Sequence, residues 1–271
     1  MEKIEKDKYY TPQHIVDLVI QRTKEVIGLD NISEFIEPSA GNVAFLDKLY
    51  ELGKPVYAYD LYPERDDIKE QDFLKLDKEY VRGTCIIGNP PFGIKNTLSV
   101  KFYKKSISLC DYIVFILPIS QLNNNQQMYE FDLIHSEDLK IQNYTNKNVH
   151  CCLNIYKKPV NLLNDKPKFH LKDVKIIESR FSNKIPKEYD VKLLAWGTGL
   201  NNLKLGGFLE SDSKEYSKVF YIKINKQEYK YDIINILKNV KWEEIYPMTA
   251  TPNLLQWQVY KYLKEQIPEL E

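Results

Sequence analysis

The residues with the most specific chemical meaning are Asn89, Pro90, Pro91 and Phe92, which directly follow an apolar segment at 84–88. Two consecutive prolines fix the backbone and leave carbonyl groups without neighbouring N–H donors. The Asn89 amide oxygen is a further acceptor. An amino group on an aromatic ring is a poor nucleophile, because its lone pair is delocalised into the ring. Acceptors on both of its N–H bonds, here Asn89 Oδ1 and the Pro90 carbonyl, favour the pyramidal geometry that attacks a methyl group.

Phe92 completes this NPPF motif (Asn89 to Phe92), and its ring is suited to stack on a base taken out of its helix. The alternative is that the two prolines only end a strand and that Phe92 belongs to the core. For an isolated motif the two interpretations have equal weight. The position of the motif favours the first, because ligands of an open parallel sheet lie outside the carboxyl ends of the strands.

A glycine turn and two acids follow other predicted strands. The turn at 35–42 contains Gly41, which lets a ligand approach the backbone and its N–H groups. Asp60 ends the next strand about twenty residues after Glu37, a spacing typical of the acid that bonds ribose hydroxyls in nucleoside-binding folds. Asp72, followed by an aromatic residue, is placed to accept from an adenine amino group. Each feature alone is more often an ordinary turn, so the hypothesis depends on all of them together.

Alternating strand-like and helix-like segments position these residues. A helix is predicted from Pro12, with Thr11 as its N-cap. Further helices are predicted around 45–50 and at 98–109, strands at 33–37, 56–60, 84–88 and 112–117, and an antiparallel hairpin at 139–143 and 149–156. Strand and helix in repetition predict an α/β fold, with a mostly parallel sheet and helices on both faces.

The alternation ends at Pro159, and Lys and Asn become frequent beyond it. We therefore predict a catalytic domain at 1–159 and a small α+β module at 160–271. In this module, strands are predicted at 191–196 and 219–224 and helices at 231–237 and 254–263. The cysteines and histidines lack the spacing of a metal site, so no metal is expected.

The charge of the chain is balanced. Lys+Arg and Asp+Glu both number 38, which gives no broad basic surface for nucleic acid. Two lysine-rich stretches are candidate phosphate contacts, although a solvated face is the commoner role of such a cluster. They are the residues after the NPPF motif (Lys95, Lys101, Lys104 and Lys105) and the segment 166–187, which contains Lys184. The charged first residues contain no signal-peptide core, so a soluble intracellular protein is predicted.

Taken in chain order, these motifs resemble those of the N6-adenine DNA methyltransferases, the class I, S-adenosylmethionine-dependent family with an NPPF-type motif. The matching segments are Tyr9–Pro12, Glu37–Asn42, Asp60, Asp72–Leu74 and Asn89–Phe92. The resemblance covers about residues 8–159. It implies a Rossmann-like sheet with a terminal antiparallel hairpin, S-adenosylmethionine as cofactor, and methyl transfer to the N6 amino group of an adenine flipped into the NPPF pocket.

The resemblance also implies roles for single residues. The cofactor's methionine end would lie against Tyr10, Thr11 and Pro12, and its amino-acid and sulfonium region against Glu37, Pro38, Ser39 and Gly41. Asp60 would hold the ribose, Asp72 and Phe73 the adenine, and Leu61 and Asn89 complete the cofactor-binding set. Asn89, Pro90, Pro91 and Phe92 would hold the target base, helped by the hairpin strand at 148–153. One departure is Val43, where the family often has a second glycine.

DNA is the implied partner, read in part by the C-terminal module, with a restriction nuclease or a second subunit as a further partner. Three alternatives stay open. An RNA adenine methyltransferase also carries this motif, and a protein glutamine methyltransferase more usually has Tyr at the Phe92 position. The third is a non-catalytic subunit with a methyltransferase fold, against which the intact NPPF motif argues.

Overall fold

The computed structural model describes residues 11–41, 43–144, 147–181, 185–197, 205–209, 218–247 and 253–271. The chain forms two compact units, Met1–Pro167 and Lys168–Glu271. The division therefore follows Pro167, whereas the sequence predicts it at Pro159. Within the described ranges, no helix is long and apolar enough to cross a membrane.

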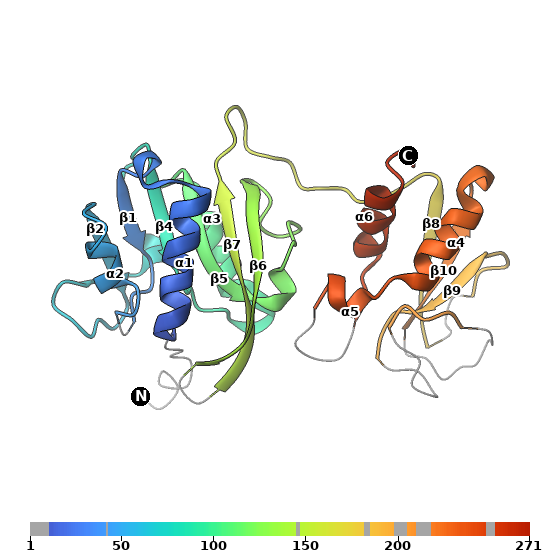
Figure 1. The fold of residues 1–271 in the computed structure, drawn as a ribbon, viewed down its shortest axis with the longest axis horizontal. Helices are drawn as coiled ribbons and strands as arrows, with labels where there is room; N and C mark the ends of the chain where they lie inside the picture. The colour runs from blue at the N-terminus through green and yellow to red at the C-terminus, as the bar shows by residue number, and fades with distance from the viewer. Residues whose placement is uncertain are drawn as a thin grey trace. The chain divides into compact units, whose positions relative to one another are not determined.

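The first unit contains a seven-stranded sheet with the order β3-β2-β1-β4-β5-β7-β6 (Figure 1). Its strands are β1 (Glu34–Glu37), β2 (Val56–Asp60), β3 (Lys69–Glu70), β4 (Thr84–Gly88), β5 (Tyr112–Pro118), β6 (Asp132–Tyr144) and β7 (Lys147–Lys157). The pairs from β3 to β5 are parallel, whereas β7 runs antiparallel to both β5 and β6. The predicted mostly parallel sheet with a terminal hairpin is confirmed.

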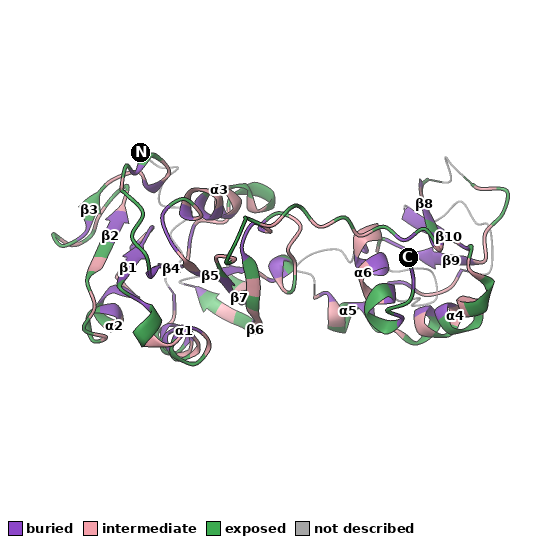
Figure 2. Cartoon of the chain, turned by 90° about the horizontal axis from the view of Figure 1, so that it is seen from above, coloured by how far each residue is buried: buried purple, intermediate pink, exposed green. Residues whose placement is uncertain are grey.

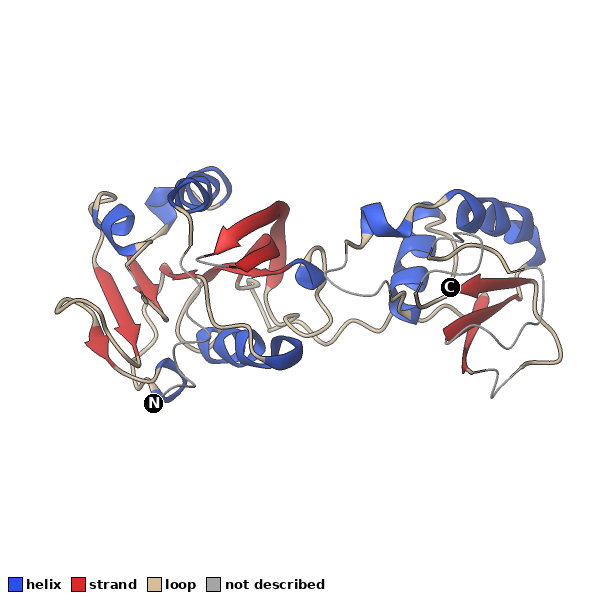
Figure 3. Ribbon diagram, turned by 90° about the horizontal axis from the view of Figure 1, so that it is seen from below, coloured by secondary structure: helices blue, strands red, loops and turns tan. Residues whose placement is uncertain are grey.

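Helices cover both faces of this sheet (Figure 3). They are α1 (Gln13–Val26), α2 (Leu46–Tyr50) and α3 (Thr97–Ser106). Along the central strands, Phe35 and Cys85 pack in the same cluster as residues of α1, whereas Ile36 and Ile86 pack with residues of α3. The central strands are consequently buried along most of their length (Figure 2), as expected for strands that are covered on both sides.

The direction of the chain through the sheet reverses at β1. From β1 the chain moves outward to β2 and β3, and it then returns to β4 on the other side of β1. Loops that leave the carboxyl ends of two such neighbouring strands diverge and open a crevice. The segments that begin at Pro38, after β1, and at Asn89, after β4, therefore lie at the same crevice.

The start of α1 differs from the prediction. Pro12 occupies the N-cap position, and no side chain caps the helix. The Thr11 hydroxyl instead accepts a hydrogen bond from Asn89 Nδ2 at 3.2 Å. The prediction of Thr11 as the N-cap is therefore wrong, because its side chain bonds a segment far along the chain rather than the helix that follows it.

The second unit contains a three-stranded antiparallel sheet with the order β8-β10-β9. Its elements are β8 (Val174–Arg180), β9 (Val191–Leu194), β10 (Lys218–Ile224), α4 (Lys230–Asn239), α5 (Trp242–Ile245) and α6 (Gln256–Gln266). Sheet and helices share one apolar cluster, which includes Phe220, Trp242 and Leu263. The small α+β unit agrees with the prediction, although β8 and α5 were not predicted.

Packing against Trp242 leaves no room for a side chain at Gly206 in the second unit. Its φ is +73°, and a Cβ built there would lie 2.0 Å from Trp242 Cδ1. Because Trp242 is only 1% exposed, the ring has little room to move. We expect Gly206→Ala to lower the free energy of unfolding by roughly 3 kcal/mol or more, as measured by urea denaturation.

Gly197 is the matched control. Its φ is +79°, and no atom of the described residues lies within 4 Å of a Cβ built there. Gly197→Ala should therefore show only the cost of the left-handed backbone, about 1–2 kcal/mol. Equal losses in the two variants would contradict the role given to the Gly206–Trp242 contact.

Candidate active site

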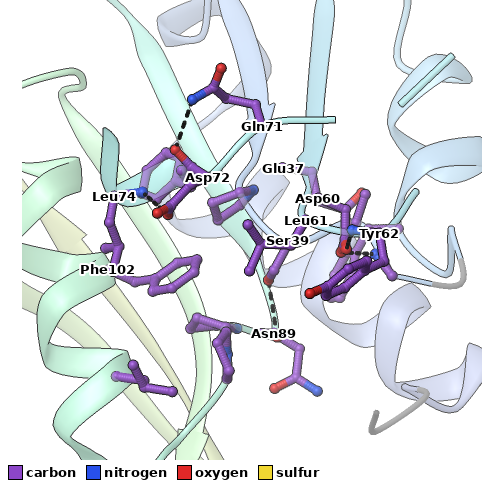
Figure 4. A pocket seen from close by; sticks show the side chains of 18 of the residues that line it. Glu37, Ser39, Asp60, Leu61, Tyr62, Gln71, Asp72, Leu74, Asn89 and Phe102 are labelled. Carbon is purple, nitrogen blue, oxygen red and sulfur yellow. Dashed lines mark hydrogen bonds between the residues drawn. The ribbon is translucent and has the colours of Figure 1, made fainter. Parts of the chain in front are cut away.

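A cavity of about 370 Å³ lies at the crevice described above, within the range of roughly 300–1,000 Å³ typical of small-molecule sites. The predicted site residues that line it are Thr11, Glu37, Pro38, Ser39, Gly41, Asp60, Leu61, Asp72, Phe73, Asn89, Pro90, Pro91 and Phe92. Pro12 does not line it, and Tyr10 and Lys184 lie outside the described residues. Figure 4 shows Asp60 and Tyr62 on one side of the cavity, Asp72 and Phe102 on the other, and Asn89 below.

Several lining residues were not predicted from the sequence: Ala40, Ala44, Phe45, Tyr62, Gln71, Leu74, Leu98 and Phe102. Ala40, Tyr62, Gln71 and Leu74 adjoin predicted residues in the chain, and Ala44 and Phe45 follow the glycine turn, so the loops were found but not their full extent. Leu98 and Phe102 are different, because they belong to α3. Their spacing of one helical turn places them on the same face of that helix, which was the available signal.

Asp60 ends β2 and holds the glycine turn in place. Its Oδ2 accepts from the Gly41 amide at 2.8 Å, and its Oδ1 accepts from the Tyr62 amide at 2.8 Å. The Ala40 amide also donates to the Tyr59 carbonyl at 2.9 Å. These bonds fix the orientation of the carboxylate, which keeps lone pairs for hydroxyl groups of a ligand.

Glu37 ends β1 and is 2% exposed. Among the residues that the structure describes, no donor bonds its Oε2. Burial, followed by the nearby negative charge of Asp60, holds the pKa of Glu37 well above its ordinary value. A buried oxygen without a donor is costly, by about 1–3 kcal/mol. Because Glu37 lines the cavity, a donor on a bound ligand would satisfy this oxygen.

Two hydrogen bonds hold Asn89 at the end of β4. Its Nδ2 donates to Thr11 Oγ1 at 3.2 Å, and its carbonyl accepts from Ser39 Oγ at 3.4 Å. The first bond fixes which way the side-chain amide faces. Within the described part of the chain, no donor bonds Asn89 Oδ1.

The other carbonyls of the NPPF motif are not equivalent. The Pro91 carbonyl accepts from Ser99 Oγ at 3.3 Å, and the Phe92 carbonyl accepts from the Leu98 amide at 3.1 Å. No donor among the described residues bonds the Pro90 carbonyl. Among the described residues, Asn89 Oδ1 and the Pro90 carbonyl are therefore the acceptors of the motif that no donor bonds.

Aromatic residues form the apolar part of the wall. Phe73 is 2% exposed and stacks on Phe102, with 5.3 Å between the ring centroids. Phe92 is partly buried and packs against the cluster that contains α1 residues. The Asp72 carboxylate lies beside Phe73 in the chain, and its Oδ1 accepts from the Leu74 amide at 3.0 Å. The aromatic wall and the carboxylate are thus both held in place by contacts within the chain.

Val43, the departure noted in the sequence, has a φ of +65°. This left-handed conformation costs a residue with a Cβ roughly 1–2 kcal/mol and is natural for glycine. The side chain packs against a small cluster that includes Ala40 and Leu46, and it does not line the cavity. The valine therefore strains the backbone next to the glycine turn rather than narrowing the cavity.

The predicted phosphate contacts differ in their surroundings. Lys95 and Lys101 are exposed, and Lys105 is partly exposed. Lys104 forms an ion pair with Glu130, so its charge is neutralised within the unit. Within the described ranges, no group of three or more His, Cys, Asp or Glu residues is arranged to hold a metal ion.

The strand order with its antiparallel β7 defines the class I methyltransferase fold. No family model matches the chain. The Type II methyltransferases M.HincII and M.HindII, both of Haemophilus influenzae, are each 31% identical to it over 138 residues. The match covers 43% of this chain and 25% and 24% of the two relatives, so the chain spans about a quarter of the length of the curated relatives it matches. These relatives confirm the resemblance to methyltransferases that the motifs predict.

Two solved structures are similar at lower identity. A proposed RNA methyltransferase from Pyrococcus horikoshii has a TM-score of 0.47 and 15% identity, covering 59% of this chain and 92% of its own. A type I restriction-modification methyltransferase subunit from Streptococcus thermophilus has a TM-score of 0.45 and 12% identity, covering 97% of this chain and 59% of its own.

The buried Glu37 carboxyl makes a pH test of the cavity possible. Its pKa in the folded protein lies well above the ordinary value of 4.5. Between these two pKa values the carboxyl ionises only in the unfolded chain, so the free energy of unfolding falls as pH rises through this range. Glu37→Gln cannot ionise. We expect the free energy of unfolding of this variant to rise relative to that of the unaltered, ligand-free protein as pH rises from 4 to 8. The difference should grow by about 1.4 kcal/mol for each pH unit between the ordinary pKa and the folded-state pKa.

Urea denaturation across that pH range measures the effect. Glu79→Gln is the control, because Glu79 is exposed. A difference between Glu37→Gln and the unaltered chain that stays constant with pH would contradict the raised pKa.

Proposed function

We propose that this chain transfers a methyl group from S-adenosylmethionine to the N6 amino group of adenine in DNA. One observation carries the proposal. A single cavity joins a glycine turn held by Asp60 to an NPPF motif whose acceptors, Asn89 Oδ1 and the Pro90 carbonyl, have no donor in the described part of the chain. The sequence similarity to Type II methyltransferases supports the same conclusion.

The residues of the cavity fit S-adenosylmethionine, which supplies an electrophilic methyl group when bound. Glu37 would accept from the amino group of the methionine part, which supplies the donor that its Oε2 lacks. Asp60 would accept from the ribose hydroxyls, and Asp72 from the adenine amino group. Phe73 would pack against the adenine ring. Pro38, Ser39, Gly41 and Leu61 would complete the wall around the cofactor.

The target adenine would lie against the NPPF motif. Asn89 Oδ1 and the Pro90 carbonyl would each accept from one N–H of the amino group, which stabilises the positive charge that develops on nitrogen as the methyl bond forms. Thr11 positions the Asn89 amide for this contact. Phe92 would stack on the face of a base that has been flipped out of the duplex.

The second unit and the lysines after the NPPF motif are proposed to contact DNA. Lys95, Lys101 and Lys105 provide exposed or partly exposed cations near the cavity, whereas Lys104 is committed to Glu130. The proposed partners are DNA and, by analogy with restriction-modification methyltransferases, a companion nuclease or a second subunit that completes target recognition. RNA is the alternative target, and the experiment below includes it as a substrate.

The decisive experiment follows the transfer of labelled methyl from S-adenosylmethionine to unmodified duplex DNA, the same DNA denatured, and RNA. We expect incorporation into duplex DNA, with digestion yielding N6-methyladenine as the labelled nucleoside. Label only in RNA, or only in cytosine, would contradict the proposal. Titration calorimetry with the cofactor is the companion measurement, and no binding at millimolar concentration would point to a non-catalytic subunit.

The acceptor role of Asn89 is tested by Asn89→Ala. We expect the rate of transfer to fall by about two orders of magnitude or more, as for other donors and acceptors aimed at a transition state. The affinity for S-adenosylmethionine should change little, because Asp60, Asp72 and Glu37 are unaltered.

Asn164→Ala is the matched control, since Asn164 is partly exposed, bonds Asp132 and does not line the cavity. It should transfer at the unaltered rate. A near-normal rate in Asn89→Ala would remove the acceptor pair from the mechanism.

A further inference from the structure

Ile94, two positions after Phe92, is an exposed apolar residue beside the cavity. Its exposed fraction is 84%, among the highest for large apolar side chains in the described ranges. Most exposed apolar residues lie singly on a surface and need no explanation. Ile94 differs because a constrained loop holds it next to the NPPF motif.

The loop that carries Ile94 is fixed at both ends. The Phe92 carbonyl accepts from the Leu98 amide at 3.1 Å, and Asn96 Nδ2 donates to Ser120 Oγ at 3.0 Å. Gly93 has a φ of +67°, and a Cβ built there would lie 2.8 Å from Leu98 Cγ. Only glycine fits there without a shift of Leu98, so the loop leaves Phe92 by one defined path.

Two further residues of the loop are strained. Lys95 and Asn96 have φ values of +53° and +63°, at a cost of about 1–2 kcal/mol for a non-glycine residue, less for Asn. Backbone strain of this kind persists where the surrounding structure holds it and is frequent at functional sites. Here the strained turn presents Ile94 to solvent, so no apolar burial within the chain offsets its cost.

The surroundings of Ile94 favour a polyanion as the partner of this loop. Lys95 follows it directly, and Lys101 lies on α3, the helix that begins where this loop ends; both lysines are exposed. An apolar tip followed in the chain by two exposed cations suits insertion between stacked bases, with the lysines contacting phosphates. An apolar groove on a partner protein would bind Ile94 but would give the neighbouring lysines no negative charge to contact.

We infer that Ile94 is a wedge that enters the DNA duplex beside the target adenine and fills the space that the flipped base leaves. This inference rests on the proposed function. Phe92 and Ile94 belong to one hydrogen-bonded loop. When a flipped base stacks on Phe92, the base-pair step that it has left would therefore lie next to Ile94. Filling the vacated stack with an aliphatic side chain lowers the cost of unstacking, which is a few kcal/mol per step.

The test compares transfer to unmodified duplex DNA with transfer to the same DNA denatured, for the unaltered chain and for Ile94→Ala. The wedge is needed only where a stack must be opened. We expect the duplex rate of Ile94→Ala to fall by roughly tenfold or more, and the single-strand rate to change by less than about twofold. Ile94→Leu, which keeps an aliphatic side chain of the same size, should restore most of the duplex rate.

Val160→Ala is the control, because Val160 is 95% exposed and lies outside the cavity wall and the loop. It should leave both rates unchanged. Failure of the proposed function is a separate result, in which the unaltered chain methylates no DNA. If the unaltered chain methylates duplex DNA and Ile94→Ala does so equally well, or loses both rates in proportion, the wedge is overturned. It is also overturned if Ile94→Ala loses activity together with a change in sedimentation, which would assign Ile94 to a contact between copies of the chain.

Discussion

The carboxylate of Asp60 is the interaction on which the cavity depends. It receives the Gly41 amide from the turn after β1 and the Tyr62 amide from its own loop, so one side chain joins the ends of β1 and β2. The same turn reaches the end of β4 through the bond from Ser39 to the Asn89 carbonyl. Three loops that would otherwise diverge from a parallel sheet are thereby held as one wall. Without these bonds the crevice at the reversal of the chain would exist, but it would have no fixed shape.

Local costs accumulate around this wall. Val43 holds a left-handed backbone, Glu37 buries an oxygen that no donor of the described residues bonds, and the loop after Phe92 contains two strained residues. Each of these features lowers the free energy of unfolding by about 1–3 kcal/mol. They are tolerated because the sheet beneath them is covered on both faces by apolar clusters. The stable part of the unit thus consists of the sheet and the apolar clusters on its two faces, and the strained or unpaired groups lie at the carboxyl edge of the sheet.

Much of this arrangement was predictable because it is local in the sequence. The apolar run at 84–88 forms β4 with the predicted bounds, and both acceptors, Asn89 Oδ1 and the Pro90 carbonyl, belong to the four residues of the NPPF motif itself. What escaped prediction depends on contacts between distant residues. Thr11 bonds Asn89 rather than its own helix, and Lys104 is neutralised by Glu130. β8 was missed because its alternation of buried and exposed positions breaks at Ile177 and Glu178, and a polar residue, Ser179, takes the next buried position.

The balanced charge of the chain bears on how a duplex would be held. Equal numbers of acids and bases give little long-range attraction for a polyanion. Lys104, which the sequence counts as a cation, contributes less than its position suggests because Glu130 pairs with it. Few phosphate contacts then remain near the cavity, and each contributes a modest, salt-sensitive part of the binding energy. Under this constraint the proposed short-range contacts, stacking on Phe92 and insertion of Ile94, would gain importance. A chain of this charge would therefore recognise its target more through contacts with unstacked bases than through electrostatic attraction to the phosphates.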